Sequence, residues 1–200
     1  MSQQTDERRE YFRIKNWIVI NHEPIDSLES VPPIDEVAKT SSPKIRLLQE
    51  LTRLENENQA YLGSLTDKQS QLGNYLLNLN KKLELLTQFA VESLHTDEEH
   101  LTEVDISGGG LRFTCDEKYP IDQLMKIEII LVPECVGVVA YARVVDSRPA
   151  ESGEGHEIAL IFVKLNEAHR DAIIKHVFQV QSKQLREIKE NSGESDENAT

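Results

Sequence analysis

A leucine repeat without proline, between residues 44 and 94, constrains the fold of this chain more than any other feature. With Leu48 at a heptad a position, nine of the thirteen a and d positions through Ala90 are leucine, and the phase never slips. A seven-residue repeat sustained this long indicates helices that pack against other helices. Ser42 is a good N-cap and Pro43 suits the first helical position, so we expect helix to begin there.

The apolar stripe is wider than a two-stranded coiled coil needs, because most g positions are also apolar or aromatic. They are Leu47, Leu54, Tyr61, Tyr75 and Phe89. Three apolar positions per heptad are typical of bundles of more than two helices. Polar residues within the stripe can fix register and helix number, and here they are Glu55, Asn58 and Gln69.

Two helical arrangements satisfy this repeat. One is a continuous helix over residues 43–97, about 75 Å long for ~50 residues, which needs other copies along its length. The other is a hairpin that breaks between Gly63 and Asp67, since Gly63 and Gly73 each weaken a helix by roughly 1 kcal/mol. We favour the continuous helix and a homo-oligomer, with a tetramer favoured over a dimer by the wide stripe.

The rest of the chain is dominated by β-strand patterns. A strand is predicted over residues 12–20, and LTEVDISGGGLRF, LMKIEIILVP, VGVVAYARVVDSRP and HEIALIFVKL follow residue 101. No helix fits between the later strands, which predicts an antiparallel sheet that closes as a barrel. Asn166 caps a final helix. The fold class is therefore α+β.

The predicted organisation follows the composition. It is an N-terminal arm with the first strand (1–22), a linker (23–42), the long heptad helix (43–97), the remaining barrel with its C-terminal helix (98–190), and a disordered acidic tail (191–200).

Charge and hydropathy limit the classes of function that we expect for this protein. Lys plus Arg is 22 and Asp plus Glu is 35, a net charge of −13, which weighs against DNA binding and adhesion to anionic membrane. No run of 18 apolar residues occurs and the N-terminus is polar, so we expect a cytoplasmic protein without membrane insertion.

Catalytic motifs are missing from the sequence: it has no GxSxG, no HExxH and no Walker loop. His95 and His100 are five residues apart and would lie on different faces of a helix, which is a poor metal pair. We therefore expect no enzymatic activity, no metal site and no cofactor.

Two polar clusters are candidates for ligand binding. Arg8, Arg9 and Arg13 concentrate positive charge in an acidic chain, and guanidinium groups fork onto phosphates and onto the O6/N7 edge of guanine. In DISGGG, Asp105 can accept hydrogen bonds from a base and Ser107 can bond base or phosphate. Taken separately, the first cluster is compatible with a solvated arm and the second with a hairpin turn.

Taken in order, RREYFR and DISGGG resemble the PilZ family pattern, RxxxR followed by [D/N]xSxxG. The resemblance implies a six-stranded barrel that binds cyclic di-GMP. It also implies roles for the motif residues: Arg8, Arg9 and Arg13 contact guanine edges and phosphates, Asp105 and Ser107 bond base and backbone, Gly108 and Gly109 leave room for the ligand, and Gly110 holds the turn.

About 80 residues separate the first strand from the DxSxxG strand, and this insertion resembles that of tetrameric PilZ proteins with a helical bundle. The resemblance implies a cyclic di-GMP receptor, oligomerised by its helices, that acts on an unidentified protein partner. The alternative is a PilZ-like structural adaptor that binds no nucleotide and acts through protein partners.

Overall fold

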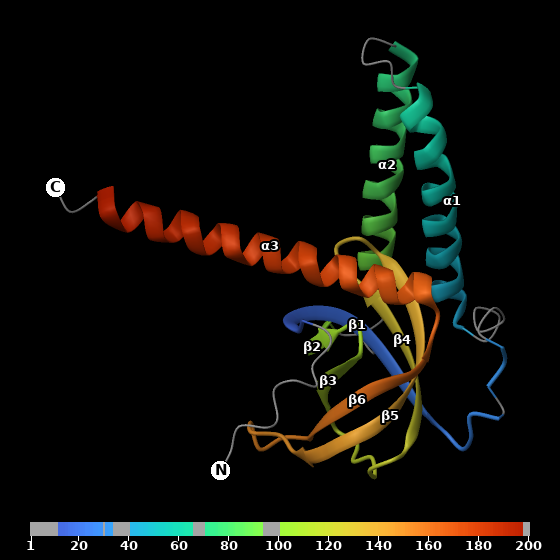
Figure 1. Ribbon diagram of the computed structural model, residues 1–200, viewed down its shortest axis with the longest axis vertical. Coiled ribbons are helices and arrows are strands. Elements are labelled where there is room, and N and C mark those ends of the chain that lie inside the picture. Colours follow the sequence, from blue (N-terminus) through green and yellow to red (C-terminus); the bar gives the residue numbers. More distant parts are fainter. Residues whose placement is uncertain (1–11, 30, 34–40, 66–70, 94–100, 198–200) are drawn as a thin grey trace.

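The computed structural model describes residues 12–29, 31–33, 41–65, 71–93 and 101–197. Within these described ranges the chain forms six strands and three helices (Figure 1). The strands are β1 (Ile14–Ile25), β2 (Leu101–Ser107), β3 (Gly110–Cys115), β4 (Leu124–Leu131), β5 (Val136–Pro149) and β6 (His156–Leu165). The helices are α1 (Pro43–Leu65), α2 (Gln71–Ser93) and α3 (Glu167–Glu197). None of these helices is long and apolar enough to cross a membrane.

The strands form a closed antiparallel barrel in the order β1-β2-β3-β6-β5-β4, which confirms the predicted fold class. Side chains on alternating positions of each strand fill the barrel, as the strand period requires. Fully buried examples are Ile18, Ile106, Leu111, Ile127 and Leu160. Closure pairs β1 with both β2 and β4, so the N-terminal strand lies beside segments that follow it by about a hundred residues.

The insertion is a helical hairpin, so the prediction of one continuous helix is wrong. Helix α1 ends at Leu65, α2 begins at Gln71, and the two run side by side in opposite directions (Figure 1). Residues 66–70, between the two helices, lie outside the described residues, and the end of α1 at Leu65 agrees with the hairpin alternative. The heptad phase could not reveal the break, because Leu65 and Leu72 keep a seven-residue spacing across it.

Helix α1 is seated on the barrel through its first two turns. Ser42 caps it as predicted: its Oγ accepts from the Ile45 N–H at 3.4 Å. The Glu128 carboxylate accepts from the Ser42 N–H at 2.9 Å. Ile45 and Leu48 are buried against β5, where a Cβ at Gly137 would lie 3.1 Å from the Ile45 carbonyl oxygen. The close approach of this glycine therefore determines where the hairpin attaches.

Helix α3 closes one end of the barrel and continues beyond it (Figure 1). Asn166 caps it, its Oδ1 accepting from the Ala168 N–H at 2.8 Å, and Ile173 and Val177 are buried in the barrel core. The helix extends to Glu197, so the acidic segment predicted to be a disordered tail is helical over most of its length. The segment lacks proline, and its single glycine does not stop the helix.

Strand β1 also extends further than predicted, to Ile25, and takes in the start of the segment read as a linker. Pairing with β4 explains the extension, since Glu23 and Pro24 lie opposite Lys126 and Met125. Pairing with β4 outweighs the preference of these residues for turns.

Candidate functional site

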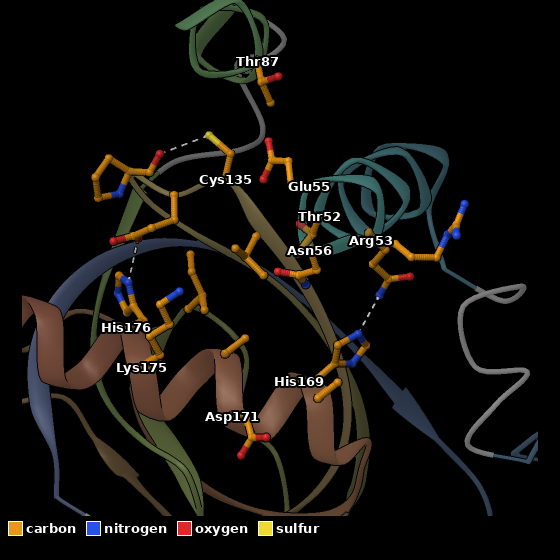
Figure 2. A pocket seen from close by; sticks show the side chains of 18 of the residues that line it. Thr52, Arg53, Glu55, Asn56, Thr87, Cys135, His169, Asp171, Lys175 and His176 are labelled. Carbon is orange, nitrogen blue, oxygen red and sulfur yellow. Dashed lines mark hydrogen bonds and ion pairs between the residues drawn. The ribbon is translucent and has the colours of Figure 1, made fainter. Parts of the chain in front are cut away.

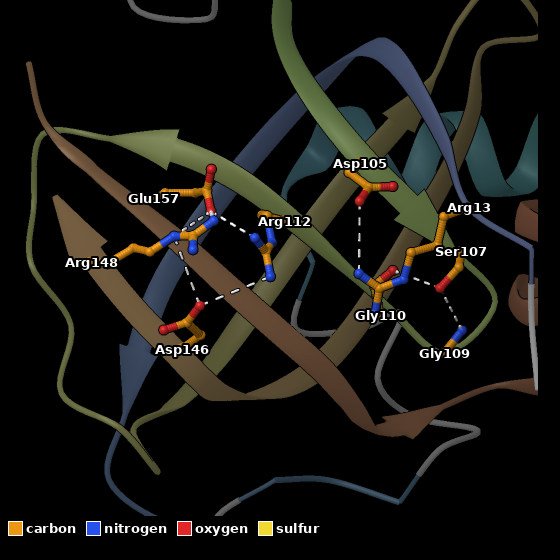
Figure 3. A network of polar contacts seen from close by, with 9 residues as sticks. All are labelled: Arg13, Asp105, Ser107, Gly109, Gly110, Arg112, Asp146, Arg148 and Glu157. Atoms are coloured by element: carbon orange, nitrogen blue, oxygen red, sulfur yellow. Dashed lines mark hydrogen bonds and ion pairs between the residues drawn. The ribbon is translucent and has the colours of Figure 1, made fainter. Parts of the chain in front are cut away.

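The two sequence motifs meet on the outer face of the barrel, where β1, β2 and β3 run side by side. Ile14 lies opposite Ile106, which places Arg13 beside the end of β2. The Arg13 Nη1 atom lies 3.7 Å from Asp105 Oδ2, and about a third of each side chain is exposed. Figure 3 shows this ion pair beside the β2–β3 turn. Arg8 and Arg9 lie outside the described residues.

The hydroxyl of Ser107 is used within its own turn. Ser107 Oγ donates to the Gly110 carbonyl oxygen at 3.2 Å and accepts from the Gly109 N–H at 3.3 Å. The residue is 3% exposed. Ser107 therefore shapes the turn, which differs from the direct base or phosphate contact that the sequence suggests.

Gly110 is required by packing. A Cβ at this position would lie 2.1 Å from the carbonyl oxygen of Leu160 on β6, a distance no real Cβ contact shows. The absent side chain lets β3 approach the β6 backbone closely.

The other two glycines are tied to neighbouring elements through their backbones. Arg170 Nη1, on α3, donates to the Gly108 carbonyl at 2.6 Å. The Phe162 N–H, on β6, donates to the Gly109 carbonyl at 2.9 Å. Gly108 is buried, so the open space predicted there is absent, whereas Gly109 is partly exposed. Sequence reasoning missed Arg170, because no motif links the first turn of α3 to the β2–β3 turn.

A second set of charged residues continues the site across β3, β5 and β6 (Figure 3). Arg112 Nη1 lies 2.7 Å from Glu157 Oε1, and Arg148 binds the same oxygen through Nε at 2.9 Å and Nη2 at 2.5 Å. Asp146 lies 3.9 Å from Arg112 and 4.0 Å from Arg148. Burial raises the pKa of Glu157, but the hydrogen bond from Arg148 and the two guanidinium charges outweigh it and hold the pKa below its usual value.

A cavity of about 720 Å³ lies elsewhere, between the helical hairpin, the β4–β5 turn and α3 (Figure 2). His176 forms part of its wall and is 2% exposed. The Asn16 amide donates to His176 Nε2 at 2.7 Å, and His176 Nδ1 donates to Glu134 at 2.9 Å. The hydrogen bond from His176 lowers the pKa of Glu134 against the opposing effect of burial. None of the motif residues that the structure describes lines this cavity.

Metal binding has no support in the described part of the chain, which contains no group of three or more His, Cys, Asp or Glu side chains placed to hold an ion.

Comparison with known proteins identifies the barrel. Residues 85–179 match the family model for the PilZ domain. The match begins within α2 and leaves out β1, so Arg13 lies outside it. No curated protein matches the sequence.

Two solved structures are similar to this one, and the first supports the fold. A tetrameric PilZ domain protein of Xanthomonas campestris, self-assembled via a helical bundle, is 18% identical, with a TM-score of 0.56; the match covers 88% of this chain and 91% of that one. The inhibitor of motility of Bacillus subtilis is 11% identical, with a TM-score of 0.48; the match covers 90% of this chain and 54% of that one.

Proposed function

Since the chain carries a PilZ domain, we propose that it is a non-enzymatic receptor for cyclic di-GMP, which it binds on the face formed by Arg13, Asp105 and the glycine turn. The observation that carries this proposal is the Arg13–Asp105 ion pair. It brings the end of the RxxxR motif to the DxSxxG motif, although the whole helical hairpin separates them in sequence.

The chemistry of these groups suits a guanine dinucleotide. A guanidinium can fork onto phosphate or onto O6 and N7 of guanine, while a carboxylate accepts from the base N–H groups. The ligand would exchange the weak, part-exposed Arg13–Asp105 pair for its own contacts, and would recruit Arg8 and Arg9.

Titration calorimetry of the full chain with cyclic di-GMP tests the proposal. We expect saturable binding by the wild type and a loss of at least about tenfold in Arg13→Ala, because a hydrogen bond to a charged group contributes roughly 1.5–3 kcal/mol. Arg186→Ala is the matched control, since Arg186 is exposed on α3 away from the site. Failure of the wild-type chain to bind would refute the proposal.

A structural adaptor that binds no nucleotide is the second candidate. The observation in its favour is that the PilZ model match excludes Arg13 and the strand β1 that follows it. An adaptor would show no change in melting temperature with added cyclic di-GMP, whereas a ligand that binds only the folded state must raise it.

We further propose that α2 assembles the protein into a homo-oligomer. Six large apolar side chains on α2 are between 41% and 65% exposed: Tyr75, Leu77, Leu79, Leu83, Leu85 and Leu86. They lie on more than one face of the helix, and exposed apolar surface of this extent normally marks an interaction site. Helix α1 covers only one side of it (Figure 1). Other copies of the hairpin are the natural cover, and the breadth of the apolar surface favours a tetramer over a dimer.

A further inference from the structure

Asp105 and Arg112 are directly opposite each other on β2 and β3. Their side chains stand on the outer face of the barrel, 33% and 31% exposed. Directly opposed residues of an antiparallel pair have Cβ atoms about 4.5–5.5 Å apart. A carboxylate and a guanidinium are therefore held side by side, and Figure 3 shows them turned toward different partners.

This spacing of groups matches the edge of a guanine base. Guanine presents N–H donors, N1–H and the 2-amino group, beside two acceptors, O6 and N7. A carboxylate complements the donors and a guanidinium forks onto the acceptors. We infer that Arg112 reads the O6/N7 edge of a guanine whose N–H groups face Asp105, an inference that rests on the proposed function.

The surroundings of Arg112 permit this role. Its Nη1 is bound to Glu157, while its Nε is buried without a hydrogen-bond partner. Arg148 holds Glu157 through two further contacts, at 2.9 and 2.5 Å. When Arg112 turns toward a ligand, Glu157 keeps a cation, so the cost of leaving a lone partly buried carboxylate is avoided.

The floor beside the pair is also suitable for a planar base. Ala159 lies opposite Arg112 on β6, and Gly110 lies two residues before Arg112 on the same face of β3. Neither projects a large side chain over the strands. Arg112 belongs to neither the RxxxR nor the DxSxxG pattern, so sequence motifs alone do not point to it.

The test combines a change in the ligand with a change in the protein. Calorimetry compares cyclic di-GMP with its 7-deazaguanine analogue, which lacks the N7 acceptor, on the wild type, Arg112→Ala and Arg186→Ala. Arg186→Ala is the control, because it removes an exposed guanidinium on α3, away from the site. We expect the analogue to bind roughly tenfold more weakly than cyclic di-GMP to the wild type and to Arg186→Ala.

In Arg112→Ala we expect cyclic di-GMP itself to bind on the order of 10- to 100-fold more weakly, with no further loss for the analogue. An equal analogue penalty in Arg112→Ala and the wild type overturns the inference while leaving the proposed receptor function intact. Absence of wild-type binding refutes the receptor function and the inference together.

Arg112→Lys covers the case in which the alanine variant does not fold. Lysine keeps a cation beside Glu157 but cannot fork onto two acceptors. We expect a smaller analogue penalty than in the wild type, and an undiminished penalty overturns the inference.

Discussion

Arg13 Nη1 and Asp105 Oδ2 lie 3.7 Å apart on the outer face of the barrel, joining two motifs that the helical hairpin separates in sequence. The closed barrel creates this proximity, because β2, the first strand after the hairpin, pairs with β1. The pair is part-exposed and its geometry is loose. It is suited to being exchanged for a ligand, and it adds little to stability.

The first prediction concerns that ion pair. Asp105→Ala and Arg13→Ala should each change the free energy of unfolding by less than about 1 kcal/mol, because part-exposed ion pairs are screened and entropically costly. Urea unfolding measures this change. A loss above about 2 kcal/mol in both variants would show that the pair is primarily structural.

Gly110→Ala should destabilise the barrel by about 3 kcal/mol, the upper end of overpacking costs, since its Cβ would meet the Leu160 backbone oxygen at 2.1 Å. Gly153→Ala is the control. Gly153 has a φ of +84° but no atom within 4 Å of a Cβ, so only backbone strain of about 1 kcal/mol is expected. Thermal and urea unfolding of both variants give the comparison; equal losses would contradict the packing argument.

Leu48→Ala should cost about 2–5 kcal/mol, because Leu48 is 3% exposed at the base of the hairpin and its removal leaves a cavity against β5. Arg46→Ala, at an exposed position of the same helical turn, should stay within about 0.5 kcal/mol. Urea unfolding of both variants checks the difference. A Leu48→Ala protein as stable as Arg46→Ala would mean that the hairpin is not seated on the barrel as described.

Stability should fall as the pH is lowered through the range in which histidine titrates. Burial lowers the pKa of His22, which lies against Phe113 and Tyr119, and the charge of Glu117 only partly opposes this. The unfolded chain then binds the proton more readily. The contribution is therefore complete above pH about 6.5 and is lost as the pH falls through the lowered, folded-state pKa.

Unfolding free energies between pH 7.5 and pH 5 should accordingly drop less steeply in His22→Gln than in the wild type. His169 shifts in the same direction through burial, so part of the slope should remain in the variant. Identical slopes in the two proteins would contradict the assignment to His22.

The oligomer prediction is tested on α2. Leu83 is 54% exposed, and Leu83→Glu should lower the mass measured by light scattering, because it places a charge on the proposed interface. Gln184→Glu introduces the same side chain at an exposed position of α3, outside the hairpin, and should leave the mass unchanged. A monomeric wild-type chain would rule out the assembly.

Local patterns were enough to predict the strands and the caps of two helices. Ser42 and Asn166 accept the N-terminal N–H groups as their residue types predict. The heptad repeat correctly indicated helices with a broad apolar face, but it could not distinguish one helix from two. Periodicity records which residues share a face, and a short connection that conserves the phase leaves no trace in it.

The candidate site also combines features that the sequence indicated with features that it did not. The DxSxxG stretch was identifiable as a glycine turn, and its arginine partner as a cationic cluster. The sequence did not reveal the hydrogen bond from Arg170 to Gly108, which joins segments far apart in sequence. It also did not reveal the position of Arg112 opposite Asp105, which depends on the register of the β2–β3 hairpin.

The sequence by itself determined the element types, the apolar surfaces and the residue chemistry, because these follow from side-chain periodicity and propensity within short windows. Only the tertiary structure decided how the three glycines are used. Gly110 permits contact with the β6 backbone, Gly109 accepts from β6, and Gly108 is held by α3. Closure of the barrel brings those partners to the turn, and closure is a property of strand pairing across the whole chain.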